Sequence, residues 1–305
     1  MNLIDVTRDF HSEDACLAYL EHMRWPSGLA CLKCGSVKVK QLEIKAGKRA
    51  KTRRVYQCLE RECLHQFTAT TGTIFHDTHL PLRKWFMAIA LICDAKKGMS
   101  ALQLQRHLKP INYRTAWYLC HRIRRAMNEG GFQLTGEVEV DETYVGPKVL
   151  RKGKPYSKRT KKDVVLGMVE RGGRLRLLPV ADNIRPVLQP QLEKHIAPDV
   201  TVIYTDEHPT YMWGLKDRFP GKHLTIQQSR SYAIGHTHTN TIENAFSLFK
   251  RGLIGSYHHV SLKHLGKYCD EFSYRFNRRD THDMFSQTLK RMVNAGGLKY
   301  KDLVF

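Results

Sequence analysis

Two close pairs of cysteines in the first quarter of the chain constrain its fold most strongly. Cys31 and Cys34 form a C-x2-C pair, and Cys58 and Cys63 form a C-x4-C pair. Each pair can hold one side of a tetrahedral ion, so together they supply four thiolates. Such a set leaves no coordination position open, and it therefore predicts a structural Zn²⁺ site. His65, directly after the second pair, is a spare candidate ligand, and four reduced structural cysteines are the alternative.

The charge of the chain indicates a polyanionic partner. The 305 residues include 50 Lys and Arg against 29 Asp and Glu, a formal net charge of +21. Cationic side chains bind nucleic acid by displacing condensed counterions from its phosphates. A solubility effect is the alternative. Met1–Ser12 carries no secretion signal and the apolar run Trp85–Cys93 is too short to span a bilayer, so we expect a cytoplasmic protein without membrane association.

The first 130 residues also contain helical patterns. Ser12–Met23 and Leu82–Ala95 have apolar residues at helical spacing, as do Ser100–Leu108 and Asn112–Met127. The last two are separated by a short turn containing Pro110, which is typical of a helix-turn-helix unit. The second of them carries a row of basic residues that we expect to face a DNA groove: Arg114, Arg122, Arg124 and Arg125. A basic helix that merely packs on its apolar side is the alternative.

Alternating apolar residues predict β-structure after Gly130-Gly131. The predicted elements, in order, are strands at Glu137–Val145, Asp163–Glu170 and Arg174–Val180, a helix at Pro186–His195, and a buried strand at Thr201–Thr205. Three strands, a helix and a buried strand are the opening order of a ribonuclease H-like α/β fold. Two strongly basic segments, Lys38–Arg54 and Arg151–Lys162, are predicted as a hairpin and a loop.

Two aspartates interrupt or end the apolar strands of this region. Asp141 lies inside the first strand and Asp206 directly follows the last, where a carboxylate is costly unless something compensates it. Hard divalent ions such as Mg²⁺ prefer oxygen ligands, and a pair of them can clamp both oxygens of a phosphoryl transfer. We therefore expect these aspartates to bind Mg²⁺.

A third group of candidate residues follows Thr239, which can cap a helix. Asn240, Glu243 and Lys250 are spaced so that they project from one side of this helix. The carboxylate or amide could complete a metal site and the lysine could hold a DNA phosphate. A routine amphipathic helix is the alternative.

Several runs together resemble the DDE transposases of bacterial insertion sequences that carry an N-terminal zinc ribbon, the ISXO2-like group. They span about residues 15–280 and are specific in combination: Phe67–Phe75, Leu80–Trp85, Val140–Gly146, Tyr204–Asp206, His238–Glu243, Gly255–Ser261 and Glu271–Arg279. The resemblance implies a ribonuclease H-like catalytic core, dependence on Mg²⁺, and cut-and-join chemistry at the inverted-repeat ends of the element.

The resemblance also implies roles for individual residues. Asp141 and Asp206 take the two aspartate positions, and Lys250 would contact the DNA terminus. Members of the group use Asn, Glu or His at the third position. Asn240 is favoured there because asparagine is typical of zinc-ribbon relatives, whereas Glu243, a candidate Mg²⁺ ligand, has the spacing to Lys250 expected of a shared helix face. Tyr257, His258 and His259 are typical of the group but receive no chemical role.

The expected organisation has four parts. Residues 1–76 hold a helix and the zinc ribbon, 77–130 a helical DNA-binding region, 131–290 the catalytic domain and 291–305 a tail. The expected activity is that of a nucleoid-associated transposase that binds double-stranded DNA as a homodimer or higher oligomer. A nuclease or resolvase that cleaves without joining is one alternative, and a zinc-ribbon DNA-binding regulator without catalysis is the other.

Overall fold

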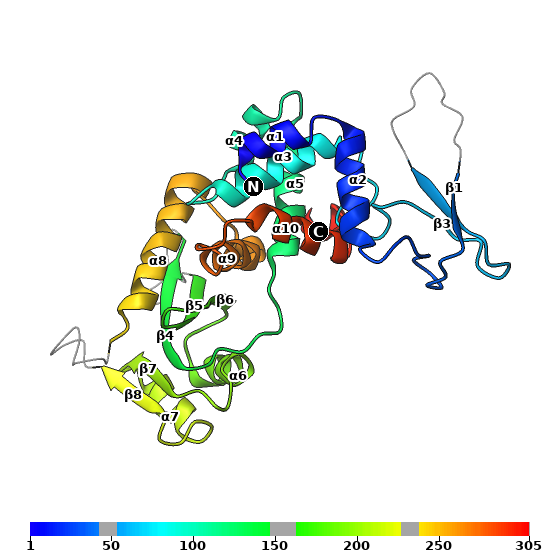
Figure 1. The fold of residues 1–305 in the computed structure, drawn as a ribbon. Helices are drawn as coiled ribbons and strands as arrows, with labels where there is room; N and C mark the ends of the chain where they lie inside the picture. The colour runs from blue at the N-terminus through cyan, green and yellow to red at the C-terminus, as the bar shows by residue number, and fades with distance from the viewer. Residues whose placement is uncertain (43–53, 147–162, 227–237, 305) are drawn as a thin grey trace. The chain divides into compact units, whose positions relative to one another are not determined.

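The chain forms two compact units in the computed structural model, which describes residues 1–42, 54–146, 163–226 and 238–304 (Figure 1). The first, here called the N-terminal unit, comprises Met1–Ala95, Met99–Met127 and Thr281–Phe305. The second, the sheet unit, comprises Lys96–Gly98 and Asn128–Asp280. The closing residues thus belong with the N-terminal segments, whereas the sequence had assigned 281–290 to the catalytic domain and 291–305 to a tail.

The N-terminal unit is mainly helical. Its helices are α1 (Leu3–Asp9), α2 (Glu13–Arg24), α3 (Leu82–Asp94), α4 (Ala101–His107), α5 (Tyr113–Met127), α10 (Met284–Asn294) and α11 (Lys301–Val304). As predicted, Ser12 caps α2 by accepting a hydrogen bond from the Ala15 amide at 3.1 Å. α10 joins this unit because its apolar face is buried, with the Phe285 ring 5.8 Å from that of Phe86 in α3.

A small antiparallel sheet follows α2 in the same unit. Its strands are β1 (Val39–Leu42), β2 (Val55–Cys58) and β3 (Gln66–Phe67), in the order β1-β2-β3. Tyr56, Phe67, Cys31 and Cys58 form one small buried cluster, with Trp25 packed against it. This small sheet and the cysteine-containing turns beside it are here called the ribbon. The apolar core of the ribbon is too small to fold alone without a further constraint.

The sheet unit contains a five-stranded mixed sheet of order β6-β5-β4-β7-β8. The strands are β4 (Glu137–Val145), β5 (Asp163–Glu170), β6 (Leu175–Val180), β7 (Val202–Asp206) and β8 (His223–Ile226). β4, β5 and β6 pair antiparallel, while β7 and β8 add to β4 in parallel. The helices are α6 (Arg185–His195), α7 (Pro209–Lys216), α8 (Asn240–Gly252) and α9 (Leu262–Phe276).

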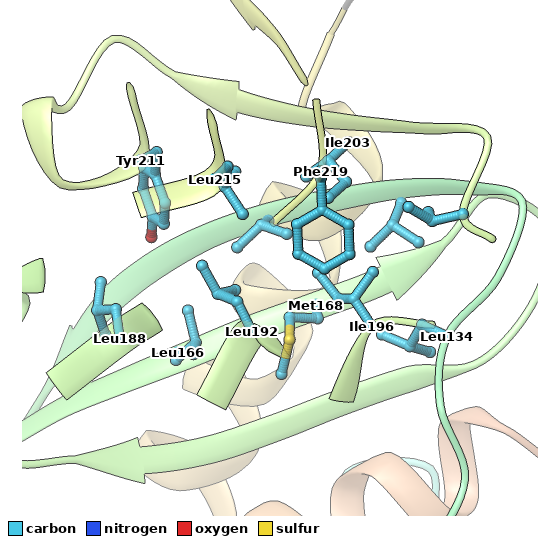
Figure 2. Close-up of a cluster of buried hydrophobic side chains, with 13 residues drawn as sticks. Leu134, Leu166, Met168, Leu188, Leu192, Ile196, Ile203, Tyr211, Leu215 and Phe219 are labelled. Atoms are coloured by element: carbon cyan, nitrogen blue, oxygen red, sulfur yellow. The ribbon is translucent and has the colours of Figure 1, made fainter. Parts of the chain in front are cut away.

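Helices cover both faces of this sheet. Met168 of β5 and Ile203 of β7 pack with α6 and α7 in one core, drawn in Figure 2. Val165 and Val169 of β5 point the other way and pack with α8 and α9. Because successive side chains of a strand alternate between faces, the two cores fix which residues of each strand point toward α8.

The predicted elements of the sheet unit are confirmed to within one or two residues at their ends. Two short elements that follow the last predicted strand, α7 and β8, were not predicted. The structure does not describe the predicted basic loop Arg151–Lys162 or residues 43–53 of the predicted hairpin. The strands on either side of residues 43–53, β1 and β2, pair antiparallel. None of the described helices is long and apolar enough to cross a membrane.

Candidate functional site

The pleat of β4 and β7 brings the two predicted aspartates together. Glu139 pairs with Tyr204 in the parallel register of these strands, so Asp141 and Asp206 follow two residues later on both. Val138 and Val140 of β4 point into the α6 and α7 core, which leaves Asp141 on the face toward α8. The same alternation, counted from Ile203, places Asp206 on that face.

Glu139 holds the beginning of α8 against this face. Its side chain is fully buried and accepts hydrogen bonds from the backbone amides of Thr241 at 2.8 Å and Ile242 at 3.0 Å. The Thr241 hydroxyl donates a third, at 2.9 Å. A carboxylate is favourable at a helix N-terminus because it satisfies free amides and complements the positive end of the helix dipole. This contact fixes where the first turn of α8 lies relative to β4.

Arg171 and His238 complete the surroundings of Glu139. The Arg171 Nε donates to Glu139 at 2.8 Å, and a guanidinium nitrogen of Arg171 also donates to the His238 carbonyl at 2.8 Å. The His238 Nδ1 lies 3.2 Å from the Glu139 carboxylate. These partners compensate for the cost of burying a carboxylate. Sequence reasoning assigned no role to Glu139. Its position two residues before Asp141, on the same face of the strand, could have indicated that it belongs to the surroundings of the site.

Gly167 allows α8 to approach the sheet closely beside Asp141. It pairs with Asp141 across β4 and β5. A Cβ atom at this position would lie 2.6 Å from the Phe246 ring and 2.7 Å from the Ile242 side chain. A larger residue here would therefore force the Phe246 and Ile242 side chains of α8 to shift.

The α8 helix places Glu243 and Lys250 at the same cleft as Asp141. These three residues line a cavity of about 440 Å³, together with Thr143, Phe246, Ser247 and others from β4 and α8. Asn240, one turn earlier, is exposed and does not line this cleft. Thr239 occupies the N-cap position, but its hydroxyl donates to the Glu243 carboxylate at 2.9 Å instead of capping a backbone amide.

The cleft has an excess of negative charge. The pKa of Asp141 is raised to about 7, chiefly by burial and then by the charges of Glu142, Asp206 and Glu243, although a backbone hydrogen bond from Glu142 opposes the shift. Burial also raises the pKa of Asp206, against the hydrogen bond donated by the His208 amide at 3.0 Å. Carboxyl oxygens that repel one another in this way are a suitable ligand set for a hard divalent cation.

This charge predicts that Asp141→Asn stabilises the metal-free protein at neutral pH. The folded pKa of about 7 lies above the ordinary aspartate value of 3.8, so the folded chain binds more protons and loses stability as pH rises between about 4 and 7. The neutral asparagine avoids that loss. We expect a gain of about 2 kcal/mol at pH 8 and little gain at pH 4, measured by urea unfolding without divalent cations. Equal gains at both pH values would contradict this.

The four predicted cysteines come together in the N-terminal unit. Their sulfur atoms all lie within 4.8 Å of one another, with Cys31 and Cys63 3.7 Å apart and Cys34 and Cys58 3.6 Å apart. Sulfurs at about 2.3 Å from a tetrahedral zinc would be about 3.8 Å apart, so the cluster fits the ion. His65 lies outside this cluster, and its ring stacks on Phe67 at 5.8 Å.

The thiols cannot all ionise easily without a cation. Burial opposes ionisation of Cys31, but hydrogen bonds from the Cys34 and Lys33 amides bring its pKa down to about 6. The Glu60 amide favours the thiolate of Cys58, yet burial and the neighbouring cysteines raise the pKa of Cys58 to about 12. A bound metal ion would relieve this competition because it stabilises four thiolates at once.

The predicted DNA-facing row on α5 is wrong for Arg122. This side chain is 5% exposed, and it donates to the Ile74 carbonyl and, at 2.8 Å, to the His76 carbonyl. Arg124 is also buried, at 2% exposed. The segment before α3, which contains Ile74 and His76, packs against the side of α5 that carries Arg122. The spacing of basic residues alone had suggested that this side faces solvent. Arg114 and Arg125 are exposed, and Arg114 lies over the Tyr300 ring at 4.1 Å.

Comparisons with known proteins match the two segments of the chain that contain these residues. Residues 11–66 match the model of the transposase zinc-ribbon domain, and residues 133–277 match that of the ISXO2-like transposase domain. The chain is also 27% identical over 287 residues to an uncharacterized protein in transposable element ISH50 of Halobacterium salinarum, covering 88% of this chain and 92% of that protein. No solved structure matches the chain. The chain therefore belongs to the insertion-sequence transposases that combine an N-terminal zinc ribbon with an ISXO2-like DDE domain.

Proposed function

We propose that this transposase cleaves DNA at the ends of its insertion sequence and joins the freed 3′-hydroxyl to target DNA. The observation that carries the proposal is that Asp141 and Asp206 lie on the sheet face toward α8, with Glu243 of α8 at the same cleft as Asp141. The mixed sheet, in which three antiparallel strands precede a helix and a parallel strand, supports a ribonuclease H-like core.

Asp141, Asp206 and Glu243 would hold Mg²⁺, for which their oxygens are suitable donors. When bound, Mg²⁺ supplies positive charge that stabilises a phosphodiester undergoing displacement. Glu243 is the better third residue because it lies close enough to raise the pKa of Asp141, whereas Asn240 does not line the cleft. Lys250, at the cleft wall, is suited to hold a phosphate of the DNA end.

The proposal is tested with purified protein and a duplex that carries one end of the element, identified by sequencing the DNA that flanks the coding sequence. Wild-type protein with Mg²⁺ should release the 3′-end of the element and then join it to a second DNA. Cleavage without joining would favour a nuclease or resolvase. Sequence-specific binding without either reaction, under conditions that leave the protein folded and zinc-loaded, would favour a regulator.

Glu139→Gln should lower cleavage about 10- to 100-fold while binding to the ends stays unchanged. The amide keeps the shape of the side chain but cannot accept from both the α8 amides and Arg171, so Glu243 is held less firmly relative to Asp141. The Mg²⁺ concentration for half-maximal rate should rise. Glu137→Gln is the matched control, since Glu137 also binds Arg171 but is 47% exposed at its side chain. If both variants behave alike, Glu139 does not position α8.

Binding to the ends should weaken steeply with salt, and Arg114 and Arg125 should contribute to that slope. Replacing both by Gln should reduce the slope of log affinity against log salt by about 2, because two phosphate contacts are lost. Arg122→Gln should instead lower stability, since its guanidinium holds buried carbonyls. An unchanged slope in the double variant would exclude these arginines from the DNA interface.

A further inference from the structure

A second cavity of the sheet unit adjoins the carboxylate cleft. Its volume of about 380 Å³ is in the range of small-ligand sites. Lys250 and Ile254 line both this cavity and the cleft that contains Asp141 and Glu243. A ligand bound across them would therefore have one part at the carboxylates and another in the second cavity.

The lining of the second cavity combines flat rings with apolar surface. Tyr144 stands at its wall with 44% of its surface exposed, and Ile254 is 72% exposed. His258 and His259 contribute two imidazole rings, while Lys250 contributes a positive charge at the side shared with the cleft. Such surfaces suit a planar aromatic group attached to an anionic one.

The backbone beside this cavity is unusual and firmly anchored. η2 (Leu253–Tyr257) is a π-helical turn that continues α8, a feature that is frequent at functional sites. His258 follows with φ 59° and ψ −50°, and the His259 amide donates to the Tyr257 carbonyl at 2.6 Å, which closes a strained γ-turn. The Tyr257 hydroxyl donates to the buried Glu271 at 2.8 Å and so ties this turn to α9. Strain of this kind is retained where it serves a site.

We propose that this cavity receives one unstacked nucleobase of the DNA end while the neighbouring phosphodiester lies at the carboxylates. The inference rests on the proposed function, because the cleft must hold DNA for a base to reach the cavity. A base inside a duplex cannot enter such a recess unless it leaves the stack. Aromatic rings compensate for the lost stacking, and Lys250 pairs with the adjacent phosphate. This assigns a role to Tyr144 and to the histidines of the Gly255–Ser261 run.

The first test measures base unstacking by fluorescence without added Mg²⁺, and so does not depend on cleavage. 2-Aminopurine replaces single bases through the terminal positions of the inverted-repeat duplex, and its emission is recorded with saturating protein. Emission should change strongly at one position near the cleavage point, because the base leaves the stack. Tyr144→Ala with Ile254→Ala should abolish that change without loss of binding. No response at any position would overturn the proposal.

The second test compares cleavage of intact duplex with cleavage of a duplex that is abasic at the responding position. Tyr144→Ala should cut the intact duplex roughly 10- to 100-fold more slowly, while Tyr144→Phe, which keeps the ring, should stay near wild type. The abasic duplex should restore most of the rate of Tyr144→Ala. Ile184→Ala, an exposed apolar residue before α6, is the matched control.

The outcomes separate this inference from the proposed function. If Tyr144→Ala and Ile184→Ala cut the intact duplex equally well, the cavity does not hold a base, although cleavage itself would still support the transposase chemistry. If Asp141→Ala cuts as fast as wild type, the proposed catalytic site is wrong. The fluorescence response then shows independently whether a base leaves the stack.

Discussion

Asp141→Ala or Asp206→Ala should reduce both cleavage and joining by at least about 10³-fold, while binding to the element ends is retained. Asp141 and Asp206 each lie two residues beyond the pair Glu139 and Tyr204 on the neighbouring strands β4 and β7, and both face α8. Each is therefore expected to supply oxygen ligands to the divalent ion. Without them, the cleft lacks the oxygen donors for the divalent ion whose charge would stabilise the transferring phosphate. Affinity for the ends could rise slightly, since a negative charge near the phosphates is removed.

Matched variants give this prediction its controls. Glu207→Gln removes the same charge from the exposed residue next to Asp206 and should leave the rates unchanged. Glu243→Ala is expected to resemble the aspartate variants, and Asn240→Ala is expected to resemble wild type, each measured with Mg²⁺ and with Mn²⁺. Loss of activity in the asparagine variant alone would make Asn240 the third residue. Wild-type rates in both aspartate variants would exclude the metal-binding interpretation.

Local patterns were sufficient to predict four of the five strands of the sheet unit and to single out both aspartates. Alternation of apolar residues indicates a strand whatever surrounds it, and a carboxylate at the end of such a strand is conspicuous because its burial is costly. The cysteine spacing is equally local, and the four sulfurs lie together as predicted. The family resemblance then supplied the expected cut-and-join activity, which these patterns alone leave open.

Sequence reasoning could not give the surroundings of residues against which a distant segment packs. Arg122 reads as part of a basic helix face, but the segment containing Ile74 and His76 covers it. Glu139 reads as a polar position in a strand, yet it receives the first turn of a helix about one hundred residues later. In an isolated helix, Asn240 and Glu243 project from the same side. Which of them lines the cleft with Asp141 depends on how α8 packs on the sheet beside Gly167.

Removal of the metal should unfold the ribbon while the sheet unit stays folded. The core of the ribbon is limited to a few residues around Tyr56 and Phe67, so most of its stability must come from the ion. One zinc per chain is expected in purified protein. Chelation, or Cys58→Ser, should abolish the slow amide hydrogen exchange of β2 and β3 and leave that of β4, β5 and β7 unchanged.

The control for the zinc prediction is a cysteine outside the cluster. Cys16 is buried in α2, and burial raises its pKa to about 12, so it is a structural thiol with no ligand role. Cys16→Ser should keep one zinc per chain and the wild-type exchange pattern of β2 and β3, even if α2 becomes less stable. Purified wild-type protein without zinc, whose four clustered cysteines react as free thiols while β2 and β3 remain protected, would show that packing alone holds the ribbon.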